Sequence, residues 1–217
     1  MSGYRKKSRD KKRLFSPDSG NIYDCIEKFF DVAALSIIWL IASLPLVTIG
    51  ASTAALYYTV NKVIRQERGY LLQEFIHSFK LNFKEGTVLW LILGGISFLL
   101  QLNIGILYSL TDGLLGLFFI IFYIFLNIWA AGVGIYAFPI LSRFDMNFGW
   151  ILKLAIYMTV RYLPATLLLL IILAVSLGLV YYLPLLLILI PSGVIYGISF
   201  IMEPILQKHK TAEESIN

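Results

Sequence analysis

LSIIWLIASLPLVTIGASTAALYYTVNKVIR, residues 35–65, consists of two apolar runs separated by a break from Pro45 to Gly50. Proline ends a helix and glycine permits the chain to reverse, so the break predicts a turn. The second run ends in the positive charges of Lys62 and Arg65, which are expected to stay on the cytoplasmic side of a membrane. The stretch therefore predicts a membrane hairpin.

The second arm of this hairpin, about residues 53–65, is short for the roughly 20 residues of a full span. Ser52 or Thr53 is expected to cap its first turn. The length leaves two alternatives open for residues 45–65, a full hairpin in a thinned or protein-lined region or a re-entrant loop.

The composition indicates a membrane protein without the help of any motif. Of the 217 residues, 59% are hydrophobic and 14% are charged, and the mean hydropathy is +0.79. A soluble domain is about half apolar and about a quarter charged. This chain has too little polar surface to coat a water-soluble globule, so a large soluble helical core is the disfavoured alternative.

The placement of the cations predicts the topology. Because cationic loops stay in the cytoplasm, the clusters assign one face of the bilayer and place both termini inside. A flanking span explains the basic N-terminus more simply than nucleic acid, so we expect no specific nucleic-acid partner. The clusters are Arg5 to Lys28, Lys62 to Lys84, Arg143, Lys153 to Arg161, and Lys208 to Lys210.

The apolar runs predict an all-α fold, a polytopic transmembrane helical bundle with about six spans and two cytoplasmic amphipathic helices. Thr111, Asp112 and Gly113 are expected to form an outer turn, and Glu203 and Pro204 are expected to end the last span. The predicted spans are 29–44, 53–65, 86–108, 114–141, 164–180 and 185–202.

The two amphipathic helices are expected over residues 69–84 and 148–161. The first has apolar residues at helical spacing, and such a helix lies flat in the cytoplasmic interface. Its expected apolar face is Leu71, Leu72, Phe75, Ile76, Phe79 and Phe83, and its polar face is Gln73, Glu74, His77, Lys80 and Lys84. The second is expected to place Lys153, Tyr157 and Arg161 on one face, with Ile151, Leu152, Ala155 and Met158 on the others.

The domain organisation follows from these elements. Residues 1–20 are expected to be a disordered basic cytoplasmic tail, 21–206 a single transmembrane domain and 207–217 a cytoplasmic tail. Residues 52–109 and 130–180 share an order of inbound helix, surface helix and outbound span, which favours two parallel repeats. The alternative is that any such unit needs interfacial arginines.

Five polar residues in or near spans are the functional candidates: Asp31, Arg65, Arg143, Arg161 and Glu203. Ionisable residues inside a membrane are costly, so they mark functional sites by default. For Asp31 the alternative is a simple pair with Lys28 on the same helix face. We expect no catalytic, cofactor-binding or metal-binding residue, because the chain has no zinc-ligand pair, no nucleophile elbow and no phosphate-cradling glycine loop.

Two stretches resemble a known family. The run LSIIWLIASLPLVTIGASTAALYY and the run FPILSRFDMNFGWILKLAIYMTVRYLPATLLL are similar to the YesL-like family of uncharacterised bacterial integral membrane proteins. The resemblance extends over nearly the whole chain after the tail. It implies a plasma-membrane location in mostly Gram-positive bacteria and a link to carbohydrate uptake, and it supplies no catalytic residues.

Two functions are therefore expected. The first is a non-enzymatic component associated with carbohydrate uptake or its sensing, which binds a carbohydrate transporter complex through cytoplasmic helices 69–84 and 148–161. The alternative is a small stand-alone transporter or channel, with a polar path lined by Asn103, Asn127, Asp31 or Glu203. We expect a membrane enzyme to be the least favoured class, given the missing catalytic motifs.

Overall fold

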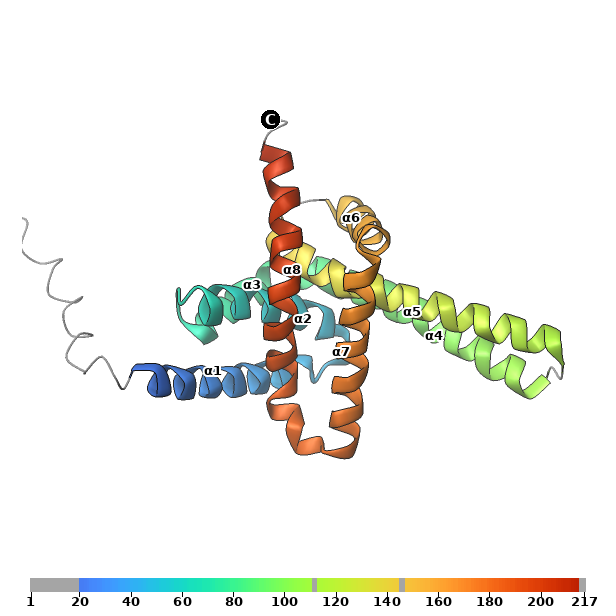
Figure 1. Cartoon of the computed structure of the whole chain (residues 1–217), viewed down its shortest axis with the longest axis horizontal. Coiled ribbons are helices and arrows are strands. Elements are labelled where there is room, and N and C mark those ends of the chain that lie inside the picture. Colours follow the sequence, from blue (N-terminus) through green and yellow to red (C-terminus); the bar gives the residue numbers. More distant parts are fainter. Residues whose placement is uncertain (1–19, 111–112, 145–146, 215–217) are drawn as a thin grey trace, which may run out of the picture.

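The computed structural model describes residues 20–110, 113–144 and 147–214, and these residues are almost entirely helical (Figure 1). The basic tail and the centre of the predicted turn at 111–113 lie outside the described residues. The α-helices are α1 (Gly20–Ser43), α2 (Ile49–Thr59), α3 (Leu71–Leu81), α4 (Phe83–Leu110), α5 (Leu114–Arg143), α6 (Phe148–Arg161), α7 (Leu163–Tyr182) and α8 (Ile190–Glu214). Short helical segments are η2 (Leu46–Thr48), the π-helical η3 (Val60–Arg65) and η4 (Pro184–Ile188).

The turn between the first two helices is shorter than the sequence predicts. Thr48 closes it by donating its hydroxyl proton towards the carbonyl of Ala42 at 2.6 Å, and α2 begins at Ile49. The prediction that Ser52 or Thr53 caps α2 is therefore wrong. Both residues lie inside the helix, and the Thr53 hydroxyl bonds the carbonyl of Ile49 in its own preceding turn.

Helix α2 is the centre of the molecule, as Figure 1 shows. It contacts α1, α3, α4, α5 and α8. Its side chains Ala51, Ala54, Ala55, Leu56 and Tyr57 are all buried. Small side chains let neighbouring helix backbones approach closely, so a short helix of this composition can be surrounded on all sides.

The closest approach joins α2 to α4 at two glycines. A Cβ atom added at Gly50 would lie 2.1 Å from the carbonyl oxygen of Gly86, and one added at Gly86 would lie 2.8 Å from the Cα of Ala51. Neither distance is possible for a real side chain. Gly50, which the sequence analysis assigned to the turn, is therefore a packing residue of the helix.

Two helical hairpins extend from this centre. The α4–α5 hairpin projects away from the rest of the chain, whereas α7 and α8 pair with each other and run across its direction (Figure 1). Pro164 stands in the first turn of α7, as predicted, where its missing N–H costs no helical bond. Of the residues expected on the other faces of α6, Ile151, Ala155 and Met158 are fully buried and Leu152 is half-buried.

By length and composition, three described helices can cross a membrane: residues 83–109 of α4, α5 and α7. This indicates a membrane protein, but the predicted count of six spans is not confirmed. Helix α2 has 11 residues and is buried in protein. The apolar run 185–202 is divided by η4, so α8 keeps only residues 190–202 before Glu203. Helix α1 is not among the three candidates either, and it carries four charged residues, namely Asp24, Glu27, Lys28 and Asp31.

Two further boundaries differ from the sequence prediction. Helix α8 continues through Pro204 to Glu214, so the expectation that Glu203 and Pro204 end it is wrong. The first amphipathic helix is α3, and Phe83 already belongs to α4. On α3 only Phe75 of the expected apolar face is fully buried, while Leu72 and Ile76 are exposed. The parallel repeats stay a prediction.

The Gly50–Gly86 approach predicts a strong effect of one added methyl group. Gly86→Ala is expected to push α4 away from α2 and lower the free energy of unfolding by about 1–3 kcal/mol, the usual cost of overpacking. Thermal denaturation of the purified protein in detergent measures the effect. Gly95→Ala, in the same helix with open space around its Cβ position, is the matched control and should not destabilise. Equal stability of the two variants would contradict the packing.

Candidate functional site

A buried carboxylate joins three helices. Glu203 of α8 is 4% exposed, and its Oε1 accepts hydrogen bonds from the Tyr57 hydroxyl at 3.0 Å and the Arg143 Nε at 3.1 Å. The Asn61 side-chain amide also donates to Oε1, and the Arg143 Nη2 donates to Oε2. We call Tyr57, Asn61, Arg143 and Glu203 the Glu203 cluster.

The Glu203 cluster supplies a cation and hydrogen-bond donors to the Glu203 carboxylate, which would otherwise be costly to bury. Moving a carboxylate out of water costs several kcal/mol unless a cation and further donors surround it. Arg143 supplies the charge through two nitrogen atoms, and Tyr57 and Asn61 supply neutral donors. The Arg143 side chain is 31% exposed and so reaches from the buried carboxylate towards the surface.

The backbone of α2 positions two of these donors. Tyr57 and Asn61 are four residues apart, which puts them on one face of a helix. At Val60 the α-helix widens into η3, and the N–H of Gln66 bonds the carbonyl of Asn61 at 3.2 Å. Single π-helical turns of this kind are rare and occur frequently at functional sites.

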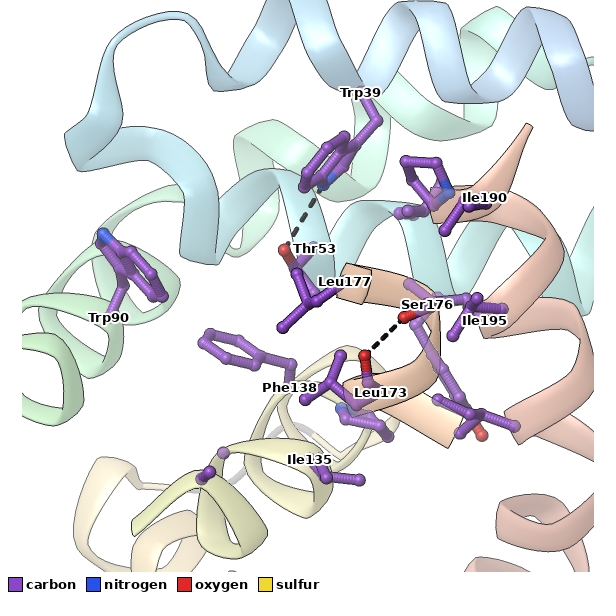
Figure 2. Close-up of a pocket in the computed structure, with 18 of the residues that line it drawn as sticks. Trp39, Thr53, Trp90, Ile135, Phe138, Leu173, Ser176, Leu177, Ile190 and Ile195 are labelled. Carbon is purple, nitrogen blue, oxygen red and sulfur yellow. Dashed lines mark hydrogen bonds between the residues drawn. The ribbon is translucent and has the colours of Figure 1, made fainter. Parts of the chain in front are cut away.

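An apolar cavity of about 470 Å³ lies on one side of the Glu203 cluster, and Tyr57 is one of its lining residues. Figure 2 shows side chains from α1, α2, α4, α5, α7 and α8 around it, with Trp39 bonded to Thr53 at 3.4 Å and Ser176 bonded to the carbonyl of Leu173 at 2.7 Å. Since these hydroxyls are engaged within the chain, the cavity presents mainly hydrocarbon.

A polar pocket of about 190 Å³ also adjoins the cluster, and we call it the basic pocket. Asn61 and Arg143 belong both to this pocket and to the Glu203 cluster, whereas Tyr57 is the cluster residue that lines the apolar cavity. Its lining residues are Tyr58, Asn61, Lys62, Gln66, Arg68 and Arg143.

Lys62 of the basic pocket lies outside the three candidate spans. Its Nζ donates to Glu74 at 2.7 Å and to the Tyr58 hydroxyl at 3.0 Å. These two hydrogen bonds raise the pKa of Lys62, the bond to Glu74 having the larger effect. Lys62 therefore remains a cation at neutral pH.

The structure brings together two of the five candidates from the sequence, Arg143 and Glu203. Arg65 ends η3 and contacts α8: its Nη1 donates to the carbonyl of Ser199 at 2.9 Å and its guanidinium is 4.7 Å from the Phe200 ring centre. Asp31 is half-buried on α1 and has interactions there. Arg161 is exposed at the end of α6, outside the Glu203 cluster.

The two amides expected to line a polar path both bond carbonyl groups of α4. Asn103 is exposed and donates to the carbonyl of Leu99 in its own helix at 2.8 Å. Asn127 donates to the carbonyl of Ser97 at 3.3 Å and so joins α5 to α4.

Sequence reasoning missed Tyr57, Asn61 and Arg68. A signal for Asn61 was present, because it is an amide within an apolar helix and shares a face with Tyr57. Nothing in the sequence pairs either residue with Glu203, more than 140 residues later in the chain. Among the described residues, no group of three or more His, Cys, Asp or Glu could hold a metal ion.

A family model described as "Protein of unknown function, DUF624" matches residues 32–104, from α1 into α4. The matched part includes Tyr57, Asn61, Lys62 and Arg68, whereas Arg143 and Glu203 lie beyond it. No curated protein and no solved structure matches the chain. The resemblance to the YesL-like family in particular stays a prediction.

The buried ion pair predicts a large effect of a nearly isosteric change. Glu203→Gln leaves the Arg143 charge without its partner, so the free energy of unfolding is expected to fall by about 3 kcal/mol. Glu67→Gln is the matched control, because Glu67 and Lys28 form a 3.2 Å pair with side chains 72% and 45% exposed. Such pairs contribute at most about 1 kcal/mol. Denaturation of both variants in the same detergent compares them, and equal losses would disprove the assigned role of Glu203.

Proposed function

We propose that this chain is a non-catalytic membrane component that assembles, through the α4–α5 hairpin, with the transmembrane subunits of a carbohydrate-uptake or carbohydrate-sensing system. The observation that supports assembly is the exposure of this hairpin. Helices α4 and α5 pack on α2, α6 and α7 near the centre of the molecule, but their outer halves pack mainly against each other.

The exposed surface of the hairpin is apolar but includes two amides. Its large exposed side chains include Phe98, Leu99, Leu102, Ile106, Phe118, Ile121, Phe122 and Phe125. Gln101 and Asn103 are exposed among them. Lipid satisfies the apolar side chains but offers an amide no hydrogen bond, whereas a neighbouring transmembrane helix offers a partner for the Gln101 amide and for the groups of Asn103 that do not bond Leu99. The two amides therefore favour a protein partner over lipid alone.

The class of partner is inferred from the YesL-like resemblance, which links the family to carbohydrate uptake. We propose that α3 and α6 add contacts on the cytoplasmic side. Helix α6 exposes Trp150, and Lys153 lies 5.2 Å from its ring centre. Tryptophan is among the residues that are enriched at protein–protein interfaces.

Photocrosslinking from the hairpin tests the assembly. A benzophenone amino acid at Phe98, which is 63% exposed, is expected to form an adduct with a membrane subunit of a carbohydrate-uptake system, identified by mass spectrometry. The same amino acid at exposed Leu168 of α7 is the control. Asn103→Leu is expected to weaken co-purification by roughly threefold or more, since one interhelical hydrogen bond is lost. Identical adducts at both positions, or lipid adducts only, would contradict the proposal.

A small stand-alone transporter is the second candidate, because the Glu203 cluster adjoins both the apolar cavity and the basic pocket. The hydrocarbon lining of the larger cavity disfavours sugars and ions, which need polar partners when they leave water.

Flux measurements separate the two functions. Our first proposal expects purified protein in liposomes to show no uptake of labelled sugar or cation above empty liposomes. A transporter that uses the Glu203 cluster would instead show uptake that changes in Glu203→Gln and persists in Glu67→Gln. Uptake of that kind would exclude the first proposal.

A further inference from the structure

The basic pocket is rich in hydrogen-bond donors. All six of its lining side chains carry an N–H or O–H group. Arg143 donates to Glu203 through Nε and Nη2, and its Nη1 does not bond that carboxylate. Lys62 donates two of its three N–H groups, one to Glu74 and one to Tyr58. Arg68 donates no side-chain hydrogen bond within the described part of the chain.

The charges around the basic pocket do not cancel. Each nearby carboxylate has a cation of its own: Glu67 has Lys28, Glu74 has Lys62 and Glu203 has Arg143. Within the described residues, Arg68 has no carboxylate at ion-pair distance. One uncompensated guanidinium therefore adds to the spare donors of Arg143 and Lys62.

The backbone holds this arrangement in place. After η3 the N–H of Arg68 bonds the carbonyl of Lys62 at 3.0 Å, which closes the chain into a tight loop. Glu67 has a φ of 54° and Gly69 a φ of 88°. Residues with a side chain rarely adopt the φ of Gly69, so the loop needs glycine there.

We propose that the basic pocket binds the phosphate group of an anionic ligand, with the headgroup of an anionic phospholipid as its main source. Arginine donors suit phosphate oxygens because their planar fork makes paired, charge-assisted hydrogen bonds. The volume of about 190 Å³ is below the 300–1,000 Å³ of pockets for drug-sized ligands, so it suits a headgroup rather than a nucleotide.

The position of the basic pocket favours a lipid source. It lies where η3 and α5 end in cations, which the sequence analysis assigns to the cytoplasmic interface. Basic pockets between helices at that interface bind phospholipid headgroups. A small soluble phosphate would make the same contacts, so the test includes both sources.

The test uses the purified full chain in neutral detergent at constant ionic strength. Phosphatidylglycerol, phosphatidylcholine or inorganic phosphate is titrated in, and the midpoint of thermal denaturation is measured. Phosphatidylglycerol is expected to stabilise the wild type, and Arg68→Gln is expected to require about tenfold more of it for the same effect. Arg161→Gln, which removes an exposed arginine outside the pocket, is the matched control and should match the wild type.

The outcomes are distinct. Stabilisation by phosphatidylglycerol but not phosphatidylcholine, lost in Arg68→Gln alone, confirms a headgroup site. Stabilisation by inorganic phosphate that Arg68→Gln removes confirms the pocket with a soluble ligand. No stabilisation by any anion, or equal loss in Arg68→Gln and Arg161→Gln, overturns the proposal. A midpoint for Arg68→Gln equal to that of the wild type without ligand shows that the variant is folded.

Discussion

The burial of one carboxylate constrains the arrangement of the helices. Glu203 is removed from water, so its oxygen atoms need a cation and several donors at close range. No residue of α8 supplies them in the described structure: they come from Tyr57 of α2, Asn61 of η3 and Arg143 of α5. The position of α8 along α2 and α5 is thereby fixed, because sliding by one turn would separate all four groups.

Helix α2 can meet this requirement because it is narrow and central. Gly50 and Ala51 let α4 approach its backbone, and Ala54 and Ala55 leave room for other helices. Its shortness, which sequence analysis treated as a difficulty for a membrane span, follows from its surroundings. A helix enclosed by protein satisfies its polar ends within the protein and need not match the thickness of a bilayer.

How much could be predicted from sequence depends on whether a feature is local. The apolar runs of α4, α5 and α7 and the position of Pro164 are local patterns, and each was predicted correctly. The end of the last helix was predicted wrongly at Pro204, since proline is a local signal that surrounding structure can override. Glu203 and Arg143 were singled out separately as polar residues near spans. Their pairing was not predictable, because they are 60 residues apart and no periodicity relates them.

Helix α5 connects the two proposals. It has 30 residues, about 45 Å, with the exposed half of the hairpin at its start and Arg143 at its end. A partner bound to the hairpin and a phosphate bound in the basic pocket would therefore act on opposite ends of one helix. Glu203 also sets a limit, because its negative charge lies directly behind Arg143 and repels an anion that moves inward. By this proposal an anionic headgroup stays at the surface, whereas the cavity that Tyr57 of the same cluster lines presents mainly hydrocarbon.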